Sequence, residues 1–564
     1  MEDLIHLIKR LNDKQIAVII LLVSWISFIP FLGSTQLFDW DEINFAEAAR
    51  EMIVLNDYLR VHIDFQPFWE KPPLFFWMQA AMMQLFGVNE FSARLPNALL
   101  GGIALVTLYF AGKQIHGKRF GLLWVLAYYG SLLPNFYFKT GIIDPWFNYF
   151  MFLSVYFIWK YYSRVSDSIL KTLVPAGIFC GLSVLTKGPV GYLLPSLTFF
   201  VMWIVKRKQW SFPIKEFVLF SVAMLITAST WFAIEFFKNG TWFISRFITY
   251  QIRLFTTGDA GHSGPFYYHT IVLLVGCFPA TLFLFKAFID RDKETEQLAL
   301  MRQFMTVLLL VVVILFSIVK TKIVHYSSMA YFPITFLAAL GIEKMLTSEN
   351  PKLNWKTINS IAFWFLGSIL ALAFAAIPLL GLFMPSVIPF AKDEFTKLVM
   401  SADVYWSGFE LSVAVVFLVG LTVAFVLLQK KQILRAVSVL FPATALGLFL
   451  LLPVVVPKLE VYLQGAPVEF YKSIQQKDVY LKVMHYKSYA DLFYSQRSYE
   501  NSGAAHGFTG DNWDVRWEQH LMHGELSKPA YFITKHNHAE KYRESDSLVV
   551  YKEKNGFVIF KRVK

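Results

Sequence analysis

Long apolar runs alternate with short polar loops along most of the chain. A helix of about 20 apolar residues crosses the hydrocarbon core of a membrane. Thirteen runs reach this length or come close to it, and they predict a polytopic α-helical membrane protein with thirteen transmembrane helices. The runs cover residues 16–32, 93–112, 120–138, 142–159, 172–186, 188–205, 216–237, 268–285, 303–319, 325–342, 358–384, 407–428 and 434–456.

The composition supports a membrane protein, because 56% of the residues are hydrophobic and only 16% are charged. Soluble domains carry about 25% charged residues, so we exclude an ordinary soluble enzyme. The two cysteines, Cys180 and Cys277, lie inside apolar runs. We expect packed thiols there, and neither a disulfide nor a metal pair.

The net charge of +12 comes from lysines and arginines that gather in alternate loops. Short cytoplasmic loops of membrane proteins accumulate these residues, whereas short external loops do not. This rule predicts a cytoplasmic N-terminus and, after thirteen spans, an external C-terminus. We expect no nucleic-acid partner, because no basic stripe with interleaved aromatic residues occurs. The predicted cytoplasmic loops carry cations within residues 113–119, 160–171, 206–215, 286–302, 344–356 and 430–435.

Two predicted external segments, residues 33–92 and 238–267, are longer than simple connectors. Within the first, residues 41–53 have the pattern of an amphipathic helix that lies in the membrane interface. Residues 72–88 are long enough to span, but a span there would reverse every later basic loop, so we predict an interfacial or half-inserted helix. The apolar face of residues 41–53 holds Phe45, Ala48, Ala49, Met52 and Ile53, and the polar face holds Glu47, Arg50 and Glu51.

The last part of the chain, residues 457–564, has a mixed composition with short alternating stretches such as 479–483 and 530–533. Such alternation is typical of strands. We therefore divide the chain into a transmembrane domain, residues 1–456, and a small external α/β domain, residues 457–564.

Charged side chains near a membrane are costly and indicate function by default. Many of them fall on the predicted external side, beside numerous aromatic residues. Carboxylates and cations that converge on one membrane face suit a reaction at an anionic lipid head group. The residues are Asp39, Asp41, Glu42, Glu70, Lys71, Lys139, Asp144, Lys187, Arg253, Asp259, His262, Lys320, Lys322 and His325.

Most of these residues also have a structural interpretation. Asp41 and Glu42 are equally suited to the first turn of a helix, and Asp144 taken alone favours a helix cap. Glu70 and Lys71 precede two prolines and are equally suited to open a helix.

Other motifs are weaker or absent. Residues 186–189, Thr-Lys-Gly-Pro, suit a tight turn and lack the spacing of a phosphate-binding loop. His262 stands alone between glycines in sequence, which is a weak metal signal. Without a Gly-rich dinucleotide fingerprint, a Gly-x-Ser-x-Gly elbow or a His-Glu-x-x-His motif, nucleotide-sugar, ATP and acyl-serine chemistry have no support.

Five longer motifs are more specific in combination than singly. They are Asp-Glu-x-x-Phe-Ala-Glu-x-Ala-Arg-Glu-Met at 41–52, Phe-Trp-Glu-Lys-Pro-Pro-Leu-Phe-Phe-Trp at 68–77, Phe-Gly-Val-Asn-Glu-Phe-Ser-Ala-Arg-Leu-Pro at 86–96, Leu-Thr-Lys-Gly-Pro-Val-Gly at 185–191 and Gly-His-Ser-Gly-Pro-Phe-Tyr-Tyr at 261–268. Together they resemble the bacterial branch of the GT-C glycosyltransferases. This branch includes the aminoarabinose transferase that modifies lipid A and is related to the protein O-mannosyltransferases. The resemblance covers roughly residues 30–345.

The resemblance implies an inverting glycosyltransferase that uses a polyprenyl-phosphate sugar as donor. By this analogy Asp41 is the catalytic carboxylate, acting on an acceptor hydroxyl, and Asp144 is a second acidic position. Lys71, Lys187 and Arg253 would bind the donor phosphate and stabilise charge on the leaving group.

The sequence departs from the family pattern at several positions. Trp40 and the pair 44–45, Asn-Phe, replace residues that are Arg and Arg-Tyr in the family, which leaves the acceptor contacts open. Gln251 appears where relatives can carry a metal-binding His. A divalent metal therefore stays open as a cofactor, with Glu70 and His262 as candidate ligands.

We therefore expect transfer of a sugar to lipid A or another envelope glycolipid at the external face of a bacterial inner membrane. A protein O-glycosyltransferase with the same donor is an alternative. A secondary transporter would also have many spans and intramembrane charges, but it favours a midplane site and internal repeats. An envelope scaffold with a vestigial site is the third class. The sequence identifies neither the sugar nor the acceptor.

Overall fold

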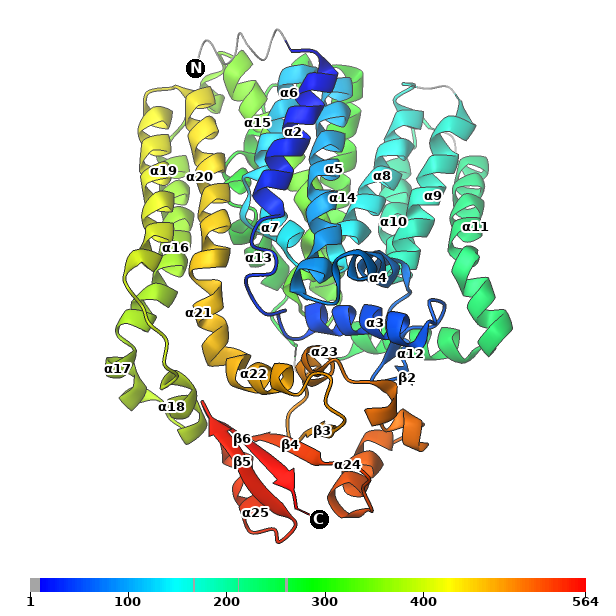
Figure 1. Ribbon diagram of the computed structural model, residues 1–564. Coiled ribbons are helices and arrows are strands. Elements are labelled where there is room, and N and C mark those ends of the chain that lie inside the picture. The colour runs from blue at the N-terminus through cyan, green and yellow to red at the C-terminus, as the bar shows by residue number, and fades with distance from the viewer. Residues whose placement is uncertain (1–10, 166–167, 211–212, 259–261, 564) are drawn as a thin grey trace.

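The computed structural model describes residues 11–165, 168–210, 213–258 and 262–563, and it is dominated by helices. A bundle of roughly parallel helices forms the larger part (Figure 1). A β-sheet from the C-terminal residues lies beyond one end of this bundle, which we call the sheet end. Asp259 and Gly261, named in the sequence motifs, lie outside the described residues.

Eight helices of the described residues are long and apolar enough to cross a membrane. A bent pair, α13 (Tyr268–Gly276) followed by Ala280–Phe288, forms a ninth candidate with an angle of 102° between its halves. The eight are α5 (Glu90–His116), α9 (Ile169–Lys187), α11 (Ile214–Asn239), α14 (Glu296–Ile318), η6 with α15 (Val324–Thr347), η7 with α16 (Pro351–Leu382), η9 with α19 (Phe409–Gln429) and α20 (Ile433–Val454).

The other four predicted runs are also helical but fall short in length or hydropathy. Each of the thirteen runs thus contains helix, while the count of thirteen crossings is not confirmed. Small residues bring these helices close together. A Cβ on Gly112 of α5 would lie 2.7 Å from the Cα of Gly121 in the next helix. The four runs contain α2 (Asp13–Phe28), α6 (Lys118–Tyr129), α8 (Asp144–Tyr162) and α10 (Val190–Lys206), and α6 is followed by α7 (Leu132–Phe136) and η1 (Tyr137–Lys139).

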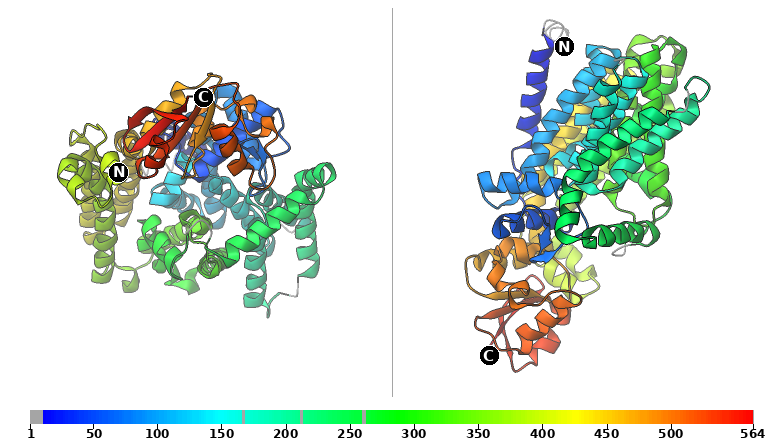
Figure 2. Two further views of the ribbon diagram at one scale, coloured as in Figure 1. Left: turned by 90° about the horizontal axis from the view of Figure 1, so that it is seen from below. Right: turned by 90° about the vertical axis from the view of Figure 1, so that its right-hand side faces the viewer.

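Three helices run across the sheet end of the bundle instead of along it, as both views of Figure 2 show. They are α3 (Asp41–Leu55), α4 (Leu74–Phe86) and α12 (Trp242–Thr256). The short hairpin of β1 (His62–Ile63) and β2 (Gln66–Pro67) joins α3 to α4. The sequence predicted helices at the positions of α3 and α4.

The polar face of α3 differs from that of an open interfacial helix. Glu47, Arg50 and Glu51 are all buried. Arg50 pairs with Glu47 at 2.7 Å, and the backbone N–H of Phe65 donates to Glu51 at 2.8 Å. Helix α23 (Ala490–Ser495), which belongs to the C-terminal part of the chain, contacts α3. Helix α3 therefore lies between the bundle and the C-terminal residues. The helical periodicity of residues 41–53 alone did not predict that its polar face is covered.

The C-terminal residues form a four-stranded sheet with helices, as the alternating stretches predicted. The strand order is β3-β4-β6-β5, with β3 parallel to β4 and the other neighbours antiparallel. The strands are β3 (Tyr480–Val483), β4 (Ala530–Lys535), β5 (Leu548–Lys554) and β6 (Phe557–Arg562), and the helices that connect or cover them include α21 (Val456–Glu460), α22 (Ala466–Ser473), α24 (Trp513–His523) and α25 (Glu540–Arg543).

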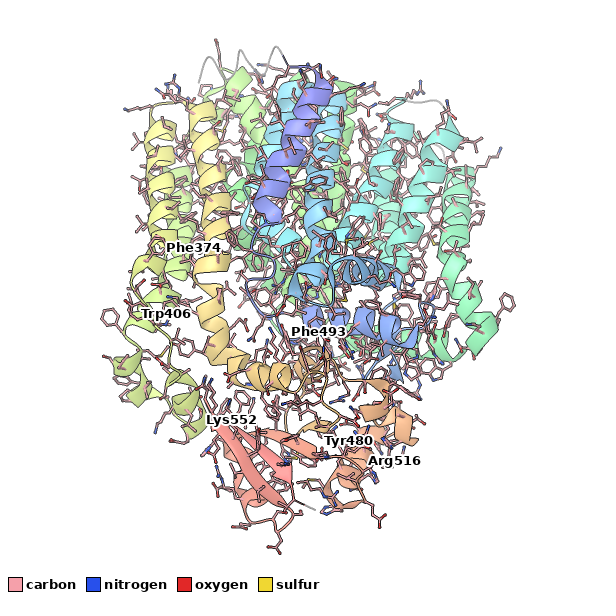
Figure 3. The ribbon with its side chains drawn as sticks, in the orientation of Figure 1. Phe374, Trp406, Tyr480, Phe493, Arg516 and Lys552 are labelled. Atoms are coloured by element: carbon pink, nitrogen blue, oxygen red, sulfur yellow. The ribbon has the colours of Figure 1, made fainter. Side chains whose placement is uncertain are left out.

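The C-terminal residues and the first loop share a hydrophobic core that contains Ile43, Phe76, Phe493 and Ile533. Phe493 lies where the bundle meets the C-terminal part (Figure 3). Polar contacts reinforce this junction, because Gln66 donates to the carbonyl of Phe508 at 2.8 Å. The first loop is therefore fixed on both of its sides, by the bundle and by the C-terminal residues.

Candidate active site

A cavity of about 370 Å³ lies at the sheet end of the bundle, between α3, α8, α9, α12, the end of α14 and the short helix η6 (Val324–Ala330). Six of the seven residues proposed from the sequence line it. The fold thus brings together side chains that come from five separate stretches of the chain. The six are Asp41, Glu70, Lys71, Asp144, Lys187 and His262.

Local structure explains how three of these side chains reach the cavity. Asp41 and Asp144 are the first residues of α3 and α8, and Lys187 is the last residue of α9. Carboxylates at helix N-termini and cations at C-termini are favoured by the helix dipole. Gly188 then turns the chain with φ of +102°, and a Cβ there would lie 2.4 Å from Phe247. Residues 186–189 therefore form the predicted turn between two helices, and Lys187 within it lines the cavity.

Asp41 is held at the cavity by a single described contact. Its Oδ2 lies 3.3 Å from Nε2 of His325, and 32% of the Asp41 side chain stays exposed. His325 was noted in the sequence only as a residue on the same side, without a role. No motif links the two residues, so only the fold, which places η6 next to the start of α3, reveals the pair.

Asp144 and Lys187 form a buried ion pair in the same cavity. Nζ of Lys187 lies 2.6 Å from Oδ1 of Asp144. The ammonium also lies over the rings of Phe147 and Tyr326, at 5.7 and 5.4 Å from their centroids. The second oxygen of Asp144 is buried and has no hydrogen-bond partner among the described residues. This pair therefore keeps one acceptor atom for a ligand.

Among the cations that line the cavity, Lys71 has the fewest described contacts. Its ammonium lies 5.2 Å from the centroid of the Tyr250 ring and makes no ion pair with any described residue. Burial lowers the pKa of Lys71, and the charges of Glu70 and Asp41 oppose this effect. An anionic ligand would compensate the Lys71 charge directly.

Arg253 occupies a different position from the other predicted phosphate ligands. It lies exposed on α12 and is not part of the cavity wall. Its guanidinium lies 5.1 Å from the centroid of the Tyr250 ring. Tyr250 itself lines the cavity, so Arg253 contacts a residue of the wall without being part of the wall.

Glu70 and His262 fit a metal site poorly. Both line the cavity, but His262 is exposed. Among the described residues, no group of three or more His, Cys, Asp or Glu side chains could hold a metal ion. Zinc sites usually have at least three protein ligands, and we derive no step through a metal.

Glu42 follows Asp41 in sequence but serves as an anchor. Its side chain is 1% exposed and accepts two hydrogen bonds from Arg94, at 2.9 and 2.7 Å. The backbone N–H of Phe38 donates to it at 2.6 Å. Arg94 also donates to the carbonyls of Leu32 and Thr35. These contacts fix the chain just before α3, and with it the position of Asp41.

Most of the remaining wall of the cavity is apolar. Phe316 and Val319 at the end of α14, Ile323 after it, and Leu254 and Phe255 on α12 all contribute to this wall. Phe255 is also 48% exposed on the outside of α12. A cavity with charged groups at one side and an apolar wall at the other suits a lipid with a charged head group.

The chain is similar to known proteins over most of its length. Residues 70–233 match the family described as dolichyl-phosphate-mannose-protein mannosyltransferase. An undecaprenyl phosphate-alpha-4-amino-4-deoxy-L-arabinose arabinosyl transferase of Pectobacterium carotovorum is 28% identical over 385 residues, which cover 67% of each protein. A protein of the same name from Wigglesworthia glossinidia brevipalpis is 24% identical and covers 70% of this chain and 69% of its own.

The fold has a close match among solved structures. The crystal structure of ArnT from Cupriavidus metallidurans bound to undecaprenyl phosphate superposes with a TM-score of 0.76. The match has 19% identity and covers 97% of this chain and 98% of ArnT. The resemblance drawn from the sequence motifs is therefore confirmed: the chain is similar to aminoarabinose transferases and has the ArnT-like GT-C fold.

Proposed function

We propose that this protein transfers a sugar from a polyprenyl-phosphate donor to lipid A or another envelope glycolipid. One observation carries the proposal. A single cavity presents the Asp41 carboxylate and the Lys71 cation, which has no ion pair among the described residues, next to an apolar wall. The names of the relatives add the donor class, and they make 4-amino-4-deoxy-L-arabinose the first sugar to test.

In this proposal the donor phosphate binds Lys71, with the Lys187 and Asp144 pair next to it. Asp41 accepts the proton of the acceptor hydroxyl, and His325 orients the Asp41 carboxylate. The hydroxyl oxygen attacks the anomeric carbon while the bond from this carbon to the phosphate oxygen breaks. Polyprenyl phosphate leaves with the electron pair of that bond, and Lys71 stabilises its charge. A single displacement inverts the anomeric centre.

The orientation in the membrane is part of the same proposal. We place the N-terminus in the cytoplasm and the C-terminal domain, residues 457–564, in the periplasm of a bacterial inner membrane. The cavity lies at the sheet end, and cations gather at the opposite end, where Lys113 pairs with Asp13 at the start of α2 and Arg119 pairs with Glu343. The positive-inside rule favours this arrangement.

The first experiment uses purified protein in nanodiscs with undecaprenyl-phosphate aminoarabinose and lipid A. Mass spectrometry should show a pentosamine-sized increase on lipid A with wild type and with Asp292→Asn. Asp292 is exposed in a loop outside the cavity and serves as the matched control. The same increase should be absent with Asp41→Asn. An unchanged lipid A with folded wild-type protein would contradict this donor and acceptor.

Two alternatives predict different results in a deletion strain. A protein O-glycosyltransferase would change the mass of envelope proteins and leave the lipid A mass unchanged. The same cavity could bind a protein hydroxyl, and the relatives' names give the donor but not the acceptor, so this strain decides between the two. A secondary transporter would move its substrate without forming a covalent product in nanodiscs.

A further inference from the structure

A second cavity, of about 740 Å³, lies between the first loop and the C-terminal domain. Residues 63, 64 and 66–70 form one wall, and residues from β3, the segment after it and α24 form the other. Glu70 lines both this cavity and the cavity that holds Asp41. We call the second cavity the interdomain cleft.

Three side chains stand where the two cavities adjoin. Trp40, which lines the Asp41 cavity, packs edge-on against Tyr489 of the interdomain cleft, with 5.5 Å between ring centroids. The ammonium of Lys487 lies 5.1 Å from the Trp40 ring and 5.5 Å from the Tyr489 ring. Lys487 is exposed and makes no ion pair with the described residues. We call these three residues the doorway.

The wall of the interdomain cleft combines aromatic rings with two cations that neighbouring carboxylates already neutralise. Arg497 pairs with Asp64 and Asp491, at 2.7 and 2.8 Å, and Lys482 pairs with Asp514. These cations are therefore poorly placed to bind a second anion. Trp69, Tyr486 and Trp513 add aromatic surface to the same cleft.

This chemistry selects among the parts of a glycolipid. Acyl chains would need a mostly apolar wall, and a phosphate would need several unpaired cations. A carbohydrate offers hydroxyl groups for the polar side chains and C–H faces for the aromatic rings, which is the mixture this cleft supplies. The single unpaired cation at the doorway, Lys487, lies nearest to the Asp41 cavity.

We infer that the interdomain cleft binds the carbohydrate head group of the acceptor, and that the doorway orients its reacting hydroxyl toward Asp41. The inference rests on the proposed function, because it assigns the acceptor site of the same reaction. It gives the C-terminal domain a role that no sequence motif suggested. The donor lipid and the acceptor sugar then occupy different cavities that meet at Glu70 and Trp40.

The test measures two affinities on the full-length protein in detergent. The acceptor probe is the water-soluble, deacylated carbohydrate head group of lipid A, and the donor-side probe is undecaprenyl phosphate. Lys487→Ala and Trp513→Ala should weaken head-group binding at least tenfold and leave undecaprenyl phosphate binding unchanged. Lys552→Ala is the matched control, because Lys552 is exposed on β5, away from the cleft (Figure 3). It should bind both probes like wild type.

Each outcome decides the inference. Wild-type head-group affinity in Lys487→Ala would overturn the doorway, and this exposed residue can be changed without removing a buried contact. Wild-type affinity in both variants, or no head-group binding by a wild-type protein that binds undecaprenyl phosphate, would overturn the cleft. Head-group binding that both variants weaken, in a protein that does not bind undecaprenyl phosphate, would support the cleft and contradict the proposed donor.

Discussion

Asp41 and Glu42 are neighbours in sequence and both line the Asp41 cavity, but their charges are held in opposite ways. Glu42 and Arg94 are almost fully buried and satisfy each other. On the wall, Asp41 has one described partner at 3.3 Å, and Lys71 makes no described ion pair. A buried charge pair fixes the backbone, whereas an uncompensated charge on a cavity wall is available to a ligand. Two acidic residues that are adjacent in sequence can thus have different functions.

The largest effect should come from Asp41→Asn, which removes the proton acceptor and keeps the shape of the side chain. General base catalysis contributes about 10²- to 10⁴-fold. The turnover rate with saturating donor and acceptor should fall by that factor, while thermal stability in detergent stays near that of wild type. A large loss of stability would show that Asp41 belongs to the anchoring group together with Glu42.

Glu42→Ala should show the reverse pattern. Removing one partner of a buried ion pair leaves an uncompensated charge and costs about 3–5 kcal/mol. We expect a much lower free energy of unfolding and little folded protein. The double variant Glu42→Leu with Arg94→Met, which replaces both charges by apolar groups, should recover part of the stability. A Glu42→Ala variant as stable as wild type would contradict the anchoring role of the Glu42–Arg94 pair.

Lys71→Ala should weaken donor binding and leave the fold intact. A hydrogen bond to a charged group contributes about 1.5–3 kcal/mol, so the donor affinity should fall roughly 10- to 150-fold. Burial lowers the pKa of Lys71, so its charge is present at low pH and is lost as pH rises, earlier than for an ordinary lysine. Donor affinity should therefore fall on the alkaline side. Lys71→Arg should move that fall to higher pH, because arginine keeps its charge.

The smallest effect should come from Arg253→Ala. Arg253 is exposed, contacts the Tyr250 ring and does not line the cavity. Changes at exposed positions are usually worth within about 0.5 kcal/mol, so donor affinity should change by about twofold or less. The donor affinities of Arg253→Ala and Lys71→Ala should be measured under identical conditions and compared. An effect as large as that of Lys71→Ala would place Arg253 among the phosphate ligands after all.

Much of the fold followed from the apolar runs, since each predicted run contains helix and the alternation after residue 457 forms strands. The number of membrane crossings could not be predicted from the sequence in the same way. Hydropathy measures apolar character, but α8 contains many tyrosines and tryptophans, and the run at 268–285 is broken by a sharp bend. Periodicity identified the polar face of α3, but not the C-terminal residues that cover it.

The candidate site was predictable where its residues belong to local motifs. Asp41, Lys71 and Lys187 lie in three separate motifs and line one cavity. The partnership of Asp41 with His325 depends on packing between distant segments, which no local pattern records. The difference between Asp41 and Glu42 is equally invisible in the sequence, because it depends on where Arg94 lies in the fold.

Glu70 lines two cavities, and this shared wall has a consequence for the order of events in the reaction. A lipid donor in one cavity and a sugar acceptor in the other do not exclude each other. Both can therefore be bound before any bond changes, and the enzyme passes through a ternary complex. In double-reciprocal plots of initial rate against donor concentration, the lines for different acceptor concentrations should then converge. Parallel lines would indicate that the sugar is first attached covalently to the protein.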